Sequence, residues 1–161
     1  PYPEIKKADV EKVAELINAA ERPMILSGHG VMISGAEKEL AALAEKADIP
    51  VAATLLGLST MPSDHPLYKG MLGMHGNIGP NINTNRADLL VAVGMRFDDR
   101  ITGNVKTYAP NARIVHIDID ASEFDKNIAT DATIHGDARQ ALEALLAVTQ
   151  SGLLPLTSRR V

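Results

Sequence analysis

Five consecutive apolar residues, Leu89 to Val93, stand between Asp88 and Gly94. A strand with one face in water alternates apolar and polar residues, so an uninterrupted apolar run of this length indicates a strand buried on both faces. Strands of this kind are typical of parallel sheets that helices cover on both sides. This segment therefore predicts an α/β fold.

The rest of the chain supplies shorter apolar segments and helical patterns in alternation. Further strands are expected at residues 24–26, 50–54, 113–118 and 133–134. Apolar residues recur at helical spacing over residues 10–20, 36–46 and 137–146, and more weakly over 80–86. A loop-rich stretch is expected over residues 55–79, where glycine and proline are frequent. Asp9 and Asp137 are placed to cap the first and the last helix.

This alternation predicts how the elements are connected. Right-handed crossovers between parallel strands give a doubly wound sheet with helices on both faces. A length of 161 residues favours a single domain. Residues 151–161 show no periodicity, so we expect a domain over residues 1–150 followed by a linker or tail. Such a chain is expected to be one domain of a longer protein.

Composition argues against several classes of function. The net charge of −4 comes without a basic stripe, which argues against a nucleic-acid partner. No apolar run approaches the roughly 20 residues of a membrane span. Cysteine is absent and the five histidines lack metal-ligand spacing, so no metal site is expected. Because neither a nucleophile elbow nor a Walker lysine occurs, we expect binding groups without catalytic residues.

Ligands of doubly wound sheets bind beyond the carboxyl ends of the strands, where the strand order reverses. Gly28-His29-Gly30 follows an expected strand, in the place of a phosphate-binding turn. The third glycine of this pattern is Gly35, which is too distant for the dinucleotide fingerprint, and the second strand ends in Thr54 rather than an acidic residue. The pattern therefore disfavours NAD. A turn that needs glycine only for its backbone geometry remains an alternative.

Two other segments carry candidate binding groups. Residues 96–100, Arg-Phe-Asp-Asp-Arg, place four charges just beyond the most buried strand. Planar guanidinium groups suit a pyrophosphate or a flavin edge, although the arginines and aspartates could instead pair with one another at the surface. In residues 72–76, a methionine suited to packing against a flat ring stands between glycines that allow close backbone approach. Asp118, at a strand end, is placed to accept hydrogen bonds from a ribose.

Several of these segments together resemble the large catalytic subunit of the acetolactate (acetohydroxyacid) synthase family. The resemblance spans about residues 1–150. It is carried by TLLG at 54–57, PSDHPL at 62–67, GMLGMHG at 70–76, ADLLVAVGMRFDDRITG at 87–103, HIDID at 116–120 and GDA at 136–138. The blocks at 70–76 and 96–100 are specific enough in combination to identify the family.

The resemblance implies a three-domain, cytoplasmic, thiamine-diphosphate-dependent enzyme of branched-chain amino-acid synthesis. Its middle domain is a six-stranded, Rossmann-like parallel sheet that binds FAD, which has no net redox role. The intact enzyme decarboxylates pyruvate and joins the fragment to a second 2-keto acid, as a homo-oligomer with a small regulatory subunit. The residues expected to line the FAD site by position are Gly28, His29, Gly30, Thr54, Leu55, Met74, His75, Gly76, Arg96, Asp98, Arg100, Asp118, Ile119, Asp137 and Ala138.

The resemblance also implies what this chain does not contain. In the family, the thiamine-activating glutamate and the Gly-Asp-Gly motif for thiamine diphosphate and Mg²⁺ belong to the flanking N- and C-terminal domains. We therefore expect this domain alone to be inactive. Departures from the family pattern at residues 77–81, Ser59 and 121–122 affect the expected loop geometry. The alternatives are a nucleotide-binding middle domain of another thiamine-diphosphate enzyme and a free-standing nucleotide-binding module.

Overall fold

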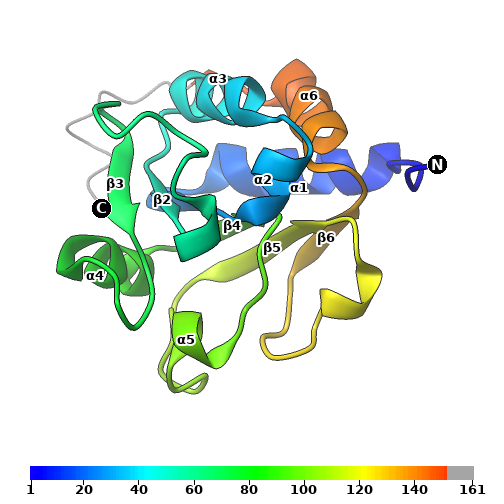
Figure 1. Ribbon diagram of the computed structural model, residues 1–161. Coiled ribbons are helices and arrows are strands. Elements are labelled where there is room, and N and C mark those ends of the chain that lie inside the picture. The colour runs from blue at the N-terminus through cyan, green and yellow to red at the C-terminus, as the bar shows by residue number, and fades with distance from the viewer. Residues whose placement is uncertain (152–161) are drawn as a thin grey trace.

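The computed structural model describes residues 1–151. Its centre is one six-stranded sheet in the order β3-β2-β1-β4-β5-β6, with every neighbouring pair of strands parallel (Figure 1). The strands are β1 (Pro23–Ser27), β2 (Val51–Ala53), β3 (Tyr68–Met71), β4 (Leu89–Val93), β5 (Arg113–Asp118) and β6 (Ala132–His135). The predicted doubly wound α/β fold with a single domain is confirmed.

Helices cover the two faces of the sheet unequally (Figure 1). One face lies under α1 (Lys7–Ala19), α3 (Glu37–Ala47) and α6 (Ala138–Val148). On the other face lie α4 (Ile78–Arg86) and the single turn α5 (Asp99–Thr102). Three short elements follow strand ends: α2 (His29–Ile33), η1 (Leu55–Gly57) and η2 (Ala121–Glu123). Within residues 1–151, none of the helices combines the length and the apolar character that crossing a membrane requires.

Strand β4 shows why its sequence is apolar throughout. Leu89, Val91 and Val93 belong to the hydrophobic core beneath α1, α3 and α6. Leu90 and Ala92 point to the opposite face, into a second core. All five side chains are buried, and full burial of a leucine or valine contributes about 1.5–3 kcal/mol relative to its exposure. The two-sided burial inferred from the run is confirmed.

Some local expectations differ from the structure. The loop-rich stretch over residues 55–79 contains the edge strand β3, and α4 begins two residues before the expected helical segment, at Ile78. Asp9 does not cap α1, because this helix begins at Lys7 and Asp9 lies within its first turn. Asp137 does cap α6: its carboxylate accepts a hydrogen bond of 3.1 Å from the N–H of Gln140.

Candidate functional site

Glycine contacts shape the point where the strand order reverses, between β1 and β4. The N–H of Gly28 donates to the carbonyl oxygen of Val93, and the N–H of Gly30 donates to that of Gly94, both at 2.9 Å. A Cβ added at Gly30 would lie 2.7 Å from the Cα of Gly94, and one at Gly28 would collide with the Gly94 carbonyl. Glycine is therefore required here for close contact between the two main chains.

A cleft of about 490 Å³ opens at the carboxyl ends of the strands, beside this point. The segments that follow β1, β2, β4 and β5 all contribute to it, as expected for a doubly wound sheet. Of the residues predicted from the sequence, those that line the cleft are His29, Gly30, Thr54, Leu55, Arg96, Asp98, Arg100, Asp118, Ile119, Asp137 and Ala138. Segments as far apart in the sequence as His29 and Ala138 thus share one cleft, because parallel strands place their carboxyl ends together.

The other four predicted residues do not line this cleft. Gly28 lies behind it, where it packs against Gly94. Met74 lines a second cavity, and His75 and Gly76 line neither of the two. Gly76 is explained by its turn, since its N–H donates to the carbonyl of Gly73 at 2.9 Å and a Cβ there would collide with main-chain atoms.

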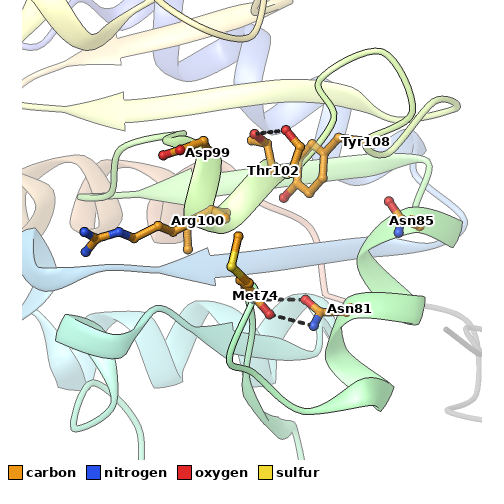
Figure 2. Close-up of a pocket in the computed structure, with 10 residues that line it drawn as sticks. Met74, Asn81, Asn85, Asp99, Arg100, Thr102 and Tyr108 are labelled. Carbon is orange, nitrogen blue, oxygen red and sulfur yellow. Dashed lines mark hydrogen bonds between the residues drawn. The ribbon is translucent and has the colours of Figure 1, made fainter.

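The second cavity, of about 230 Å³, lies between the Met74 loop, α4 and α5 (Figure 2). Asn81 fixes the loop by exchanging two hydrogen bonds of 2.9 Å with the main chain of Gly73. Arg100 and Ile101 line both cavities, so the two adjoin. Tyr108 also lines this cavity, and burial raises the pKa of its hydroxyl.

The arginines at the cleft are not paired with the neighbouring aspartates. Within residues 1–151, neither Arg96 nor Arg100 forms an ion pair with a carboxylate. The carboxylate of Asp98 instead caps α5, accepting a hydrogen bond of 3.3 Å from the N–H of Ile101. Both guanidinium groups belong to exposed residues at the cleft wall. The self-paired surface network considered from the sequence is therefore not formed.

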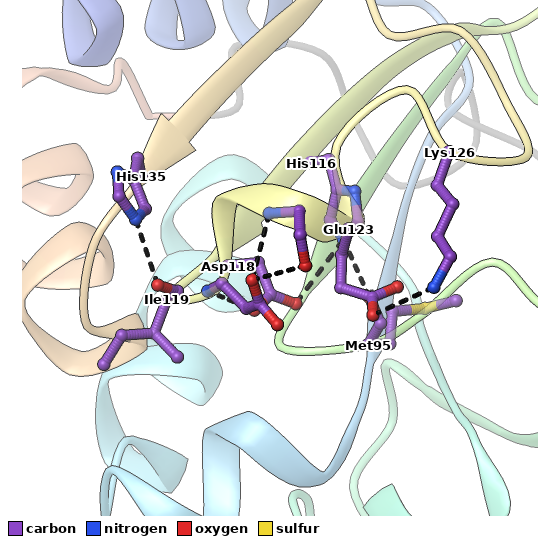
Figure 3. A network of polar contacts seen from close by, with 9 residues as sticks. Met95, His116, Asp118, Ile119, Glu123, Lys126 and His135 are labelled. Atoms are coloured by element: carbon purple, nitrogen blue, oxygen red, sulfur yellow. Dashed lines mark hydrogen bonds and ion pairs between the residues drawn. The ribbon is translucent and has the colours of Figure 1, made fainter.

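The end of β5 brings an aspartate to the cleft, within a network of polar contacts (Figure 3). One carboxylate oxygen of Asp118 accepts a hydrogen bond of 2.9 Å from the N–H of Asp120, and the other lies 3.6 Å from Nε2 of His116. The carbonyl of Ile119 lies 3.0 Å from Nε2 of His135. The Ser122 hydroxyl, and then its N–H, lower the pKa of Asp120 by hydrogen bonding to its carboxylate. Asp120 itself does not line the cleft.

The cleft also includes residues that the sequence interpretation missed. These are Tyr2, Ile33, Ser34, Leu56, Gly94, Met95 and Ile101. The position of Gly94, directly after the buried strand β4, was a usable signal. Tyr2 reaches the cleft because its segment packs on Gly136, where an added Cβ would lie 2.5 Å from Cγ1 of Ile5. No local sequence pattern indicates such a contact.

Comparison with known proteins places these features in a family. Residues 10–145 match the family described as "Thiamine pyrophosphate enzyme, central domain". The chain is 51% identical over 138 residues to the probable acetolactate synthase large subunit of Methanocaldococcus jannaschii, covering 86% of this chain and 23% of that protein. It is 45% identical over 142 residues to the acetolactate synthase large subunit of Corynebacterium glutamicum, covering 88% and 23%.

A third relative is the acetolactate synthase isozyme 3 large subunit of Escherichia coli, 40% identical over 140 residues, with 87% of this chain and 24% of that protein covered. The chain thus spans about a quarter of the length of the curated relatives it matches. The family match covers most of the chain and coincides with the doubly wound sheet. The chain therefore belongs to the thiamine pyrophosphate enzyme family, as a central domain.

Proposed function

We propose that the cleft binds FAD and that the chain serves as the FAD-holding middle domain of an acetolactate synthase large subunit. The observation that carries the proposal is the pair of arginines, Arg96 and Arg100, free of carboxylate partners within the described residues and present at the cleft wall. Unpaired guanidinium groups suit the bidentate binding of a pyrophosphate. The names of the three relatives support the assignment to an acetolactate synthase large subunit.

The chemistry of the lining fits the parts of FAD. Arg96 and Arg100 would hold the pyrophosphate, and Asp118 would accept hydrogen bonds from the ribose of the adenosine half. Apolar side chains such as Leu55, 68% exposed, and Ile33, 75% exposed, offer surface for flat rings. The adjoining second cavity extends the space available to a long ligand at Arg100. FAD would contribute no net redox chemistry here and would support the architecture of the enzyme.

The activity of the whole enzyme is part of the same proposal. We infer that the intact cytoplasmic enzyme decarboxylates pyruvate and condenses the product with a second 2-keto acid, in branched-chain amino-acid synthesis. Thiamine diphosphate, Mg²⁺ and the reacting groups would be held by domains other than this one, in a homo-oligomer with a small regulatory subunit. Among residues 1–151, no group of three or more His, Asp or Glu side chains is arranged to hold a metal ion. This domain would hold FAD without acting on substrate.

Titration of the chain with FAD, followed by flavin fluorescence, tests the proposal. Arg96→Ala is expected to raise the dissociation constant by about tenfold or more, because charge-assisted hydrogen bonds are lost. Arg113→Ala is the matched control. Arg113 is also exposed, but it begins β5 and so lies at the amino ends of the strands, whereas the cleft is at their carboxyl ends. Equal FAD affinity of the wild type and Arg96→Ala would contradict the assignment.

Parallel titrations with ADP and FMN distinguish a site for FAD from a site for another adenine nucleotide. Binding of FAD well above that of either half-molecule supports a site for the whole dinucleotide. Binding of ADP as tight as that of FAD would instead favour a middle domain that holds another adenine nucleotide.

A further inference from the structure

The main chain is held on either side of Arg96. Nε2 of His116 lies 2.7 Å from the carbonyl oxygen of Met95 (Figure 3). Nδ2 of Asn127 donates to the carbonyl oxygen of Phe97, also at 2.7 Å. Met95 and Phe97 are 4% and 5% exposed, whereas Arg96 between them is exposed. Both neighbours of Arg96 are thus anchored in the core, and its own side chain is left to reach the cleft.

The chemistry of the His116 contact fixes which ring nitrogen carries the proton. A carbonyl oxygen only accepts hydrogen bonds, so Nε2 carries a proton and donates it to Met95. Nδ1 is buried and has no hydrogen-bond partner in the part of the chain that the structure describes. An unpaired buried polar nitrogen is unfavourable, so an apolar side chain of similar size would suit packing alone better. The distinctive contribution of His116 is therefore the hydrogen bond to Met95.

Neighbouring rings fix the orientation of this imidazole. His116 is 1% exposed. Its ring meets Phe97 edge-on, with centroids 5.3 Å apart and planes at 81°, and also meets Phe124, at 5.2 Å and 75°. The same Nε2 lies 3.6 Å from a carboxylate oxygen of Asp118. One buried side chain thus contacts both the arginine-bearing segment after β4 and the acidic end of β5.

We propose that His116 is a positioning residue for the cleft: by donating to the carbonyl of Met95, it directs Arg96 toward the bound ligand. The inference rests on the proposed binding of FAD, in which Arg96 holds the pyrophosphate. His116 contacts no ligand and acts only through the main chain that carries Arg96. Loss of this hydrogen bond is therefore expected to make the main chain of residues 95–98 more mobile and, as a consequence, to weaken FAD binding.

Two substitutions of His116 separate the hydrogen bond from packing. His116→Gln can place an amide N–H close to the position of Nε2, whereas His116→Met fills similar space without a donor. His116→Met is expected to raise the FAD dissociation constant of the chain about tenfold, and His116→Gln to restore most of the affinity. Ile114→Met is the control for a buried change, because Ile114 is a buried residue of the same strand whose side chain has no hydrogen-bond donor for the carbonyl of Met95.

Nuclear magnetic resonance of the chain gives a second readout that needs no FAD. We expect long-range ¹H–¹⁵N spectra to show the proton of His116 on Nε2, and amide relaxation of residues 95–98 to show increased motion in His116→Met but not in His116→Gln. Unaltered relaxation in His116→Met would overturn the inference, as would wild-type FAD affinity in that variant. If the wild type binds no FAD, the proposed function fails, and the relaxation data alone decide the role of His116.

Discussion

The N–H of Gly30 donates a 2.9 Å hydrogen bond to the carbonyl oxygen of Gly94. This contact joins the segment after β1 to the segment after β4, where the strand order of the sheet reverses. A cleft forms beside it because consecutive crossovers leave this point in opposite directions. The glycines therefore bring the two main chains together at the cleft, and the arginines that follow Gly94 supply its charge.

Gly94→Ala is expected to lower the free energy of unfolding by about 3 kcal/mol, by combining left-handed backbone strain with overpacking. Gly94 has φ of +61°, and its added Cβ would lie 2.7 Å from the Cα of Gly30 and 2.9 Å from the nitrogen of Val31. Gly35→Ala is the control, because Gly35 has φ of +65° but nothing within 4 Å of an added Cβ. Urea unfolding measures both. Equal losses would show that the contact with Gly30 is unimportant.

Asp88 offers a test of how the amino-terminal edge of the sheet is held. Its two carboxylate oxygens accept hydrogen bonds from the N–H groups of Glu21, at 2.7 Å, and Arg22, at 2.8 Å. Asp88→Ala leaves both donors unpaired and is expected to cost about 2 kcal/mol of stability, measured by thermal or urea unfolding. Asp88→Asn keeps one acceptor oxygen and should cost less. A loss no larger than that of Asp64→Ala, an exposed loop change, would refute the role.

Much of the fold was predictable because the central strands are buried on both faces. The apolar run of β4 indicates the sheet class, and the rule that ligands bind beyond strand ends predicts most of the segments that form the cleft. β3 was missed for a physical reason. Among residues 1–151 this edge strand pairs with β2 alone, and its side chains are at most half-buried, so its sequence shows no apolar run. It also contains Gly70, with φ of +106°.

The rest of the site depends on contacts between segments far apart in sequence. His75 belongs to a conspicuous motif, but the path of its loop, fixed by Asn81, carries it away from both cavities. Tyr2 belongs to no motif and reaches the cleft through packing of Ile5 on Gly136. Local sequence patterns report local burial, and they do not report which loop passes over which strand end.

Asp125 gives a pH-dependent prediction. Its carboxylate accepts hydrogen bonds from the N–H of Thr130 at 2.7 Å and from the hydroxyl at 2.8 Å. These bonds, the backbone one first, hold the pKa of Asp125 below its ordinary value. Because the pKa is lower in the folded state, this stabilisation is complete above the unfolded-state pKa of about 3.9 and is lost as the pH falls through the folded-state pKa.

Thr130→Val removes the hydroxyl donor and is expected to move the pKa of Asp125 upward, toward its ordinary value, while the backbone bond keeps part of the shift. Carboxyl carbon chemical shifts, followed from pH 7 to pH 2, measure it. Ser122→Ala is the parallel control, since it should raise the pKa of Asp120 and leave that of Asp125 unchanged. An unmoved Asp125 pKa in Thr130→Val would mean that the hydroxyl contact does not form in solution.

Substitution of Asp118 tests which half of FAD, the adenosine half or the flavin half, lies beside the end of β5. Asp118 lines the cleft; one of its oxygens accepts a hydrogen bond from the N–H of Asp120, and the other lies 3.6 Å from Nε2 of His116. If this part of the cleft receives the ribose of the adenosine half, Asp118→Asn replaces an acceptor with a donor or a weaker acceptor. The dissociation constants of FAD and ADP should then rise about tenfold. That of FMN, which lacks adenosine, should not change. Asp120→Asn, outside the cleft, should change none of the three. A rise confined to FMN would reverse the orientation of the bound dinucleotide and place its flavin, rather than its adenosine, beside β5.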